Sequence, residues 1–497
     1  MSTIKKFAGQ TAIYGLSTIV SRLLNFILTP LFVYVYPAKQ YSIFIYMYSL
    51  ASLINPILAF GMETTFFRYL NKTDADKEKV YSNTFLTIIF IAALFLLISL
   101  PLSSLIAGWI GGKETSLADQ ALFIRYFIYI IVVDALAVIP FAKIRADGRP
   151  ARFGLIKLVN IFVFVGANLF FLFVIPMLIK ANGFVANSLH WYRHAWIGYV
   201  FISNLIASII TLLFLLPEIL QLKFRYDGAL IKNMLLYSFP VLVANISYII
   251  NENIDKIFLQ NLLPAARQQD VGIYGACCKL AIFLSIAVSA FRLGAEPFFF
   301  SHAKNKNSGE TYARIMTYFI IAVCLMCIAL SANIEILKGF IKGRDPVQQA
   351  LYWSGLQVVP ILLFGYVSLG IYMNLSIWYK LSDQTRFGLY ISGIGAILTI
   401  ILNLIFIPKY SYIASAWISL IAYATMMILS YILGQKNYPI PYQLKKNVAY
   451  LVASAVIVYL SFTVFHRNLI VGNVFLLLFM TATLYNERKE LLLLIKK

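Results

Sequence analysis

Charged side chains interrupt two stretches of the sequence that are otherwise apolar. Arg22 stands alone in "VSRLLNF", whereas Glu252, Asp255 and Lys256 stand together in "SYIINENIDKIFLQNLL". A charge in such surroundings normally faces a partner or a water-filled cavity. A lone guanidinium suits a phosphate, because its planar donor fork matches the phosphate oxygens and it stays charged. We therefore expect Arg22 to face an anionic ligand.

Further charges occupy neighbouring apolar stretches. Asp134 lies in an earlier one, and Lys279, Arg292 and Glu296 lie in the stretch that follows Lys256. Arg292 and Glu296 are four residues apart, which places both on one face of a helix. A structural ion pair is the simpler interpretation of these two residues.

The same helical spacing relates Glu252 to Lys256. Asp255 and Lys279 each lie about seven residues from the same end of their helices, which is roughly 10 Å at 1.5 Å per residue. We expect these two to pair and to hold the two helices together.

The composition decides which solvent these helices meet. Of the 497 residues, 61% are hydrophobic and only 12% are charged, which is far too apolar for a water-soluble domain. The chain is therefore expected to be an integral membrane protein. Its formal charge of +21 then reflects membrane topology and attraction to anionic lipid, and no nucleic-acid partner is expected.

Apolar windows of membrane-spanning length predict an all-α fold with about 14 transmembrane helices. Basic residues concentrate in alternate short loops, for example at Lys143, Arg145 and Lys223, which predicts cytoplasmic N- and C-termini. The predicted spans are about 10–36, 40–63, 81–107, 120–141, 154–178, 195–216, 232–262, 272–299, 313–336, 351–377, 387–407, 411–433, 448–465 and 469–485.

Internal repetition predicts how these helices are organised. "RFGL" occurs at 152–155 and again at 386–389, and the helices that follow end in "NLFFLFVIP" and "NLIFIP". At a similar offset, Arg22 of the first helix aligns with Glu252 of the seventh. Six helices separate each pair, and an even number preserves orientation, so the repeats are parallel six-helix bundles. The predicted parts are an N-lobe at 1–231, a C-lobe at 232–447, and two further helices with a basic cytoplasmic tail at 448–497.

Two similar bundles that face each other enclose a cavity, and rocking motions expose that cavity to each side in turn. Transport is therefore the expected activity, with Glu252, Asp255 or Asp134 as the candidates for a titratable coupling acid. Catalysis is not expected, because no P-loop, G-x-G-x-x-G or H-E-x-x-H motif appears. Cys324 and Cys327 lie inside a helix and are interpreted as packing, and His190 and His194 lack a third metal ligand.

Four segments carry a resemblance to a known family. They are "GMETTFFRYL", "SFPVLVANISYIINENIDKIFLQNLL", "VGIYGACCKLAIF" and "AFRLGAEPFFF". Together with the fourteen-helix plan, they resemble the lipid-linked oligosaccharide flippases (Wzx-like polysaccharide exporters) of the multidrug/oligosaccharidyl-lipid/polysaccharide (MOP) superfamily. The resemblance spans nearly the whole chain, and its most specific part is the "SFP…DKIFL…VGIY" run.

This resemblance implies a two-lobed (MATE/MOP-like) bundle with a central cationic cavity. Such a protein moves an undecaprenyl-diphosphate-linked oligosaccharide across the bacterial inner membrane by alternating access. Arg22 matches the first-helix arginine that faces the lipid diphosphate in related flippases, and Lys279 and Arg292 are cavity candidates by position. Asp255 and Lys256 match an acidic-basic pair typical of the seventh helix.

Glu252, at the depth of Arg22, is expected to act as a counter-ion or coupling acid. No cofactor is expected beyond an H⁺ or Na⁺ gradient or the membrane potential. The expected partners are the lipid-linked substrate, membrane lipids and polysaccharide-assembly proteins, and a monomer is sufficient for a cavity within one chain.

Two other functions remain open at this level. A cation-coupled MATE-type exporter of small molecules or drugs shares the superfamily, although twelve helices and fewer cationic cavity residues would be usual there. A membrane enzyme of lipid-linked glycan assembly would be expected to carry a large outer loop with catalytic residues, and no predicted loop is long enough.

Overall fold

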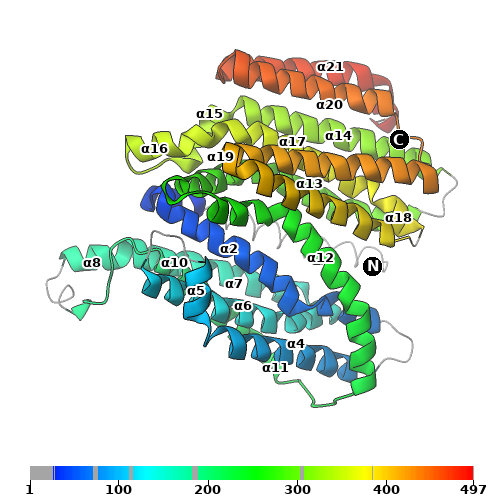
Figure 1. Ribbon diagram of the computed structural model, residues 1–497. Coiled ribbons are helices and arrows are strands. Elements are labelled where there is room, and N and C mark those ends of the chain that lie inside the picture. The colour runs from blue at the N-terminus through cyan, green and yellow to red at the C-terminus, as the bar shows by residue number, and fades with distance from the viewer. Residues whose placement is uncertain are drawn as a thin grey trace. The chain divides into compact units, whose positions relative to one another are not determined.

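The computed structural model describes residue 26 and residues 28–495, apart from the segments 71–75, 111–115, 182–187 and 303–306 and residue 383. Every regular element among these residues is a helix, and no strand occurs in the described part of the chain (Figure 1). The predicted all-α fold is confirmed. Helices satisfy their own backbone hydrogen bonds, which lipid cannot do for them, so continuous apolar sequence favours them.

The chain divides into two compact units, Met1–Gly272 and Ile273–Lys497. The described helices of the first unit are α2 (Ala38–Ala59), α3 (Met62–Leu70), α4 (Lys77–Ser99), α5 (Ser103–Ile110), α6 (Leu117–Ala146), α7 (Pro150–Leu169), η1 (Phe170–Val174), α8 (Ile175–Ala181), α10 (Gly198–Phe214), α11 (Leu216–Ile219), α12 (Gly228–Leu262) and η2 (Ala265–Arg267).

The second unit begins within α13 (Gln269–His302). Its other helices are α14 (Ser308–Ala332), α15 (Ile334–Leu337), η3 (Lys338–Ile341), α16 (Pro346–Trp353), η4 (Ser354–Gln357), α17 (Val358–Leu375), α18 (Ile377–Leu381), α19 (Arg386–Asn437), α20 (Leu444–Tyr459), η5 (Leu460–Val464) and α21 (Leu469–Ile495).

Within the described residues, 11 helical stretches are long and apolar enough to cross a membrane. Gly198–Phe214 is apolar but shorter, and the single stretch Arg386–Asn437 covers two of the predicted spans. The first predicted span, at 10–36, lies mostly outside the described residues. The multi-pass architecture is therefore confirmed, whereas the count of fourteen stays a prediction.

Helix α6 is the centre of the first unit. It contacts α2, α3, α4, α5, α7 and α10, and half of its residues are buried. Helix α12 lies along α2 in the same unit, where the Tyr46 hydroxyl donates a 3.2 Å hydrogen bond to the Asn261 side-chain oxygen. This packing gives α6 and α12 several neighbours from which polar side chains can converge.

Helix α14 has the corresponding place in the second unit, where it contacts α17, α20 and α21. The side-chain amides of Asn333 and Asn473 exchange two hydrogen bonds of 3.2 and 3.1 Å at the C-terminal end of α14. Helices α20 and α21, which follow the two predicted repeats, therefore pack on α14 of the second unit.

The charged tail continues α21 as one helix to Ile495. Glu487, which is only 2% exposed, accepts hydrogen bonds from the Lys446 ammonium and the Tyr450 hydroxyl of α20, both at 2.7 Å. The start of the tail is therefore fixed by α20.

The two predicted repeats share a local device where their matching helices end. The Asn168 amide donates to the Phe164 carbonyl at 2.8 Å, and the Asn403 amide donates to the Thr399 carbonyl at 2.7 Å. Both asparagines are fully buried, and each precedes a disturbance of the regular helix. After Asn168 the chain forms the π-helical turn η1, and after Asn403 it breaks at Ser411, which has φ 52° and ψ −140°.

The two contact units and the two predicted lobes divide the chain at different places. The predicted C-lobe starts at residue 232 and would include α12, whereas α12 contacts α2, α3 and α4 of the first unit. A sequence repeat records the order of related helices, whereas a contact unit records their packing, so the two divisions need not coincide.

Candidate functional site

The charges of α12 form a compact group inside the first unit. The Lys256 ammonium lies 2.9 Å from a carboxylate oxygen of Asp255, and the Asp255 side chain is only 4% exposed. The same ammonium donates to the backbone carbonyl of Glu252 at 2.9 Å. Lys256 therefore pairs with the adjacent Asp255 and also contacts the backbone of Glu252, one helical turn earlier.

The Glu252 side chain is half-buried. No ion pair to this carboxylate occurs among the residues that the structure describes. Its expected counterpart, Arg22, lies outside the described residues, so the proposed substrate role of these two residues stays a prediction.

Asp134 lies where α6, α7 and α10 meet. The Ser208 hydroxyl of α10 donates a 2.7 Å hydrogen bond to the Asp134 carboxylate, and Lys157 of α7 interacts with it electrostatically. One turn away along α7, the Asn160 amide donates to the Thr211 hydroxyl at 2.9 Å. Sequence reasoning found Asp134 but missed Lys157, whose partner lies 23 residues away on another helix.

Two of the predicted residues, Lys279 and Arg292, lie on α13 in the second unit. Lys279 is half-buried and Arg292 is exposed. The expected pair Asp255–Lys279 would join the two units and stays a prediction. The expected pair Arg292–Glu296 also stays a prediction, because the Glu296 side chain lies outside the described residues.

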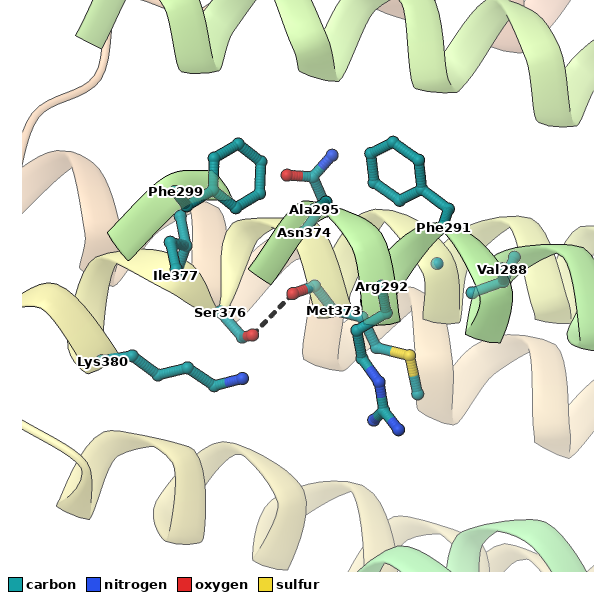
Figure 2. A pocket seen from close by; sticks show the side chains of 11 residues that line it. Val288, Phe291, Arg292, Ala295, Phe299, Met373, Asn374, Ser376, Ile377 and Lys380 are labelled. Atoms are coloured by element: carbon teal, nitrogen blue, oxygen red, sulfur yellow. Dashed lines mark hydrogen bonds between the residues drawn. The ribbon is translucent and has the colours of Figure 1, made fainter. Parts of the chain in front are cut away.

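Arg292 lines a small pocket in the second unit (Figure 2). The pocket lies between α13 and the α17–α18 segment, and Lys380 of α18 contributes a second cation to its lining. The sequence did not identify Lys380 as a candidate, because a lysine near the end of an apolar span is common. Lys380 and Arg292 are also 88 residues apart, so the sequence does not show that they line one pocket.

A group of paired charges gathers at one end of the first unit, and we call it the loop cluster. Its centre is Glu218, whose side chain is 0% exposed and which pairs with Arg149 at 3.1 Å and Arg152 at 2.9 Å. Nearby, the Tyr81 hydroxyl donates to the Glu218 carbonyl at 2.8 Å, and the Lys143 ammonium lies 4.2 Å from the centre of the Tyr81 ring. Sequence reasoning missed this role of Glu218. The basic residues of the adjoining loops were the only signal for it.

The rest of the loop cluster ties the start of α4 to the segment before α12. The ion pairs are Lys79–Asp227 at 2.6 Å, Lys223–Glu78 at 2.8 Å and Arg225–Asp76 at 3.0 Å. The Lys79 ammonium lowers the pKa of the Asp227 carboxyl, and the backbone N–H of Lys79 lowers the pKa of the Asp76 carboxyl. Three segments that were predicted to lie on one membrane face are thus in contact: the start of α4, the connection from α6 to α7, and the connection from α10 to α12.

The four cysteines form no disulfide in the described part of the chain. Cys277, Cys324 and Cys327 are buried, and Cys278 is half-buried. No group of three or more possible metal ligands occurs among the described residues.

The fold and the charges together define a class of protein. Apolar helices of membrane-spanning length form two helical units, and charges are held inside them, which is the construction of a multi-pass membrane transporter. The family described as "polysaccharide biosynthesis protein" matches residues 7–301, and the MatE family matches residues 240–405. The chain belongs to the polysaccharide biosynthesis protein family, within the MOP superfamily that its sequence resembles.

Solved structures confirm the fold. The lipid II flippase MurJ, in an inward closed conformation, matches with a TM-score of 0.71 at 15% identity, over 96% of this chain and 99% of that chain. A Vibrio cholerae MATE transporter matches with a TM-score of 0.61 at 15% identity, over 87% and 96%. An inward-facing multidrug resistance MATE family transporter of the MOP superfamily gives 0.59 at 13% identity, over 89% and 94%. No curated protein matches the sequence significantly.

Proposed function

We propose that this protein is a flippase for an undecaprenyl-diphosphate-linked oligosaccharide, the repeat unit of a polysaccharide. It moves this substrate from the cytoplasmic to the outer leaflet of a bacterial inner membrane by alternating access. The observation that carries the proposal is the match of a polysaccharide biosynthesis family over residues 7–301 of a chain whose fold resembles a lipid II flippase along 96% of its length.

The chemistry of the substrate supports this proposal. A diphosphate that crosses about 30 Å of hydrocarbon needs a charged and hydrated path, whereas its lipid tail stays in the bilayer. Arg22, Lys279 and Arg292 supply the cations for that path in our proposal. Glu252 acts as the counter-ion of Arg22 when no substrate is bound.

Coupling to an ion gradient is assigned to the first unit. Asp134 is the preferred coupling acid, because it lies inside the helix bundle with a hydroxyl donor and a lysine on neighbouring helices. Asp255 and Lys256 are assigned a structural role, because they neutralise each other within one turn. Glu296 is proposed as the ion-pair partner of Arg292 in the empty transporter.

The proposed orientation places the loop cluster and both termini in the cytoplasm. The loop cluster is rich in Lys and Arg, as the short cytoplasmic loops of membrane proteins are. In this orientation, membrane lipids and polysaccharide-assembly proteins are the expected partners, and a monomer is sufficient for transport.

A reconstitution experiment tests the proposal. The purified protein is placed in vesicles that carry an undecaprenyl-diphosphate-linked oligosaccharide with a fluorescent sugar, and an impermeant reagent quenches the outer leaflet. The protein should raise the quenchable fraction from about half toward all of the label within minutes, whereas Arg22→Gln and Lys279→Gln should lower the rate about tenfold or more. If vesicles with the wild-type protein behave like empty vesicles, the proposal is wrong.

The coupling assignment has its own test. Asp134→Asn should abolish the dependence of the flipping rate on an imposed proton or sodium gradient while leaving slow downhill flipping. The matched variants are Glu252→Gln and Asp255→Asn. If all three keep the wild-type dependence, none of these acids couples transport to the gradient.

A second candidate function is a MATE-type exporter of small molecules. The MatE match over residues 240–405 favours it. Cells that express the protein would then resist toxic organic cations, and accumulation of such a dye would fall. Unchanged dye accumulation, together with flipping of the glycan lipid, favours the flippase.

A further inference from the structure

Asp134 and Lys157 are charged side chains inside two neighbouring apolar spans of the first unit. The spans are Leu117–Ala146 and Pro150–Ala181, and the helices that carry the two residues, α6 and α7, are in contact. A charge at this depth normally has a partner of opposite sign or a hydrated cavity. The two side chains must therefore balance each other, or an ion from solution must balance each of them.

The neighbours of Asp134 stabilise its carboxylate from two other helices. The Ser208 hydroxyl of α10 donates a 2.7 Å hydrogen bond to it. The Tyr48 hydroxyl of α2 interacts with the carboxylate electrostatically, and it accepts a 2.8 Å hydrogen bond from the Asn204 amide. A hard metal cation instead needs several oxygen ligands that turn their lone pairs toward it. The hydroxyl that contacts Asp134 acts as a donor, so it suits the carboxylate better than a metal ion.

The Lys157 ammonium is held against α6 by an aromatic ring. It lies 4.3 Å from the centre of the Phe141 ring. Phe141 follows Asp134 by seven residues, which is about two helical turns, so both residues lie on one face of α6. An aromatic face attracts a cation but does not neutralise it as a carboxylate does. The ring therefore positions the ammonium and leaves its charge to act on Asp134.

The charges around Lys157 leave Asp134 as its acidic counterpart. Lys157 interacts electrostatically with Asp134 and with Arg145. Arg145 has its own acid, because its guanidinium pairs with Glu63 of α3. An ammonium close to a carboxylate repels a second cation, and this repulsion is stronger inside the bundle than in water. The place of a metal ion beside Asp134 is thus taken by a cation that belongs to the chain.

We propose that Lys157 is the built-in counter-cation of Asp134 and that it excludes Na⁺ from this acid. Lys157 is then a positioning residue, which sets the ion selectivity of the coupling step without touching the transported lipid. A sodium gradient cannot act through Asp134 in this arrangement. The inference deepens the proposed function, and only its transport test rests on that function.

Thermal unfolding tests the inference without transport. The full-length protein in detergent is melted in sodium chloride and in choline chloride at equal concentration. The wild type should melt at the same temperature in both salts. Lys157→Gln should melt about 2–4 °C higher in sodium chloride, because Na⁺ can then bind beside the uncompensated Asp134. Lys157→Arg keeps the charge and should behave like the wild type.

The matched control is Lys143→Gln. The Lys143 ammonium also lies over an aromatic ring, 4.2 Å from the centre of Tyr81, but its hydrogen-bond partner is the neutral side chain of Gln221 at 2.7 Å. This variant should melt alike in the two salts. The double variant Lys157→Gln with Asp134→Asn should also lose the response to Na⁺, because the acid that would bind the ion is gone.

Two results would overturn the inference. Stabilisation of the wild type by Na⁺ that disappears in Asp134→Asn would show that the metal ion binds despite the lysine. Equal melting of Lys157→Gln in the two salts would show that the lysine is not what keeps Na⁺ away. Binding of radioactive sodium gives a check that needs no lysine variant, because the wild type should bind no more sodium than Asp134→Asn.

Reconstituted vesicles connect the charge pair to transport. The wild type should flip the fluorescent glycan lipid at the same rate with a sodium gradient and with choline in place of sodium. An acceleration by the sodium gradient that Asp134→Asn removes would contradict the inference. If the wild type flips no glycan lipid while the melting results hold, the charge pair stands and the proposed flippase function fails.

Discussion

The loop cluster and the pocket use the same kinds of cation in opposite ways. In the loop cluster, Arg149 and Arg152 share the fully buried carboxylate of Glu218, so their charges are consumed by the protein itself. The described lining of the pocket contains Arg292 of α13 and Lys380 of α18 and no acidic residue. Cations of the same type therefore have an identified acidic partner in the loop cluster, whereas no ion pair to Arg292 occurs among the residues that the structure describes.

The largest expected effect breaks the loop cluster at its centre. Glu218→Gln keeps the shape of the side chain but leaves Arg149 and Arg152 without their shared charge. Loss of one partner from a buried pair costs about 3–5 kcal/mol. Because the two arginine side chains are 37% and 35% exposed, water compensates in part. We expect a loss of about 2 kcal/mol, which thermal unfolding in detergent micelles will show.

Glu310→Gln is the control for this measurement, because Glu310 is an exposed acid on α14.

The opposite test removes the pocket cations. Arg292→Gln with Lys380→Gln should change the free energy of unfolding by less than about 0.5 kcal/mol. A loss as large as that of Glu218→Gln would show that the pocket cations are structural and would remove the contrast.

A smaller effect is expected where the repeats end. Asn403 donates to the Thr399 carbonyl and accepts a 3.3 Å hydrogen bond from the Ser415 hydroxyl, whereas the Asn168 side-chain oxygen has no partner among the described atoms. Asn403→Ala should therefore cost about 1 kcal/mol more than Asn168→Ala, because it also leaves a buried hydroxyl without its acceptor. Equal losses in chemical denaturation would show that the two breaks are energetically alike.

The smallest effect concerns pH. The pKa of Asp76 lies below its usual value, mainly through the backbone N–H of Lys79 and further through Arg225. A lowered pKa in the folded state stabilises the protein above the ordinary pKa, and this stability is lost as the pH falls through the folded value. Wild type should therefore melt slightly above Asp76→Asn from pH 7 to about pH 5, and the difference should vanish below about pH 3. A difference that grows on acidification would contradict this assignment.

Much of the fold follows from the sequence because lipid imposes a simple rule. Apolar windows predicted the spans, and the short gap between 407 and 411 anticipated the break at Ser411 inside α19. The repeated asparagine was found from its letters, and the structure shows Asn168 and Asn403 making the same backbone contact. The sequence was sufficient for these features because each depends on residues that are close together along the chain.

The candidate site was less predictable because its contacts are distant along the chain. Glu218 meets Arg152 across 66 residues, and Lys380 shares a pocket with Arg292 across 88 residues. Even within α12, the spacing of four residues places Glu252 and Lys256 on one face, whereas the ammonium of Lys256 pairs with the adjacent Asp255. Helical spacing identifies residues that share a face, and packing then selects among them.

The most direct test of the proposed flippase is the leaflet distribution of the glycan lipid in cells. A strain that lacks this protein, but keeps the enzymes that build the lipid-linked oligosaccharide, is converted to spheroplasts and probed with an impermeant sugar-oxidising reagent. The undecaprenyl-diphosphate-linked glycan should accumulate and stay protected on the cytoplasmic face of this strain, and the wild-type gene should restore its exposure. A glycan lipid that is exposed to the same extent with and without the protein would contradict the account.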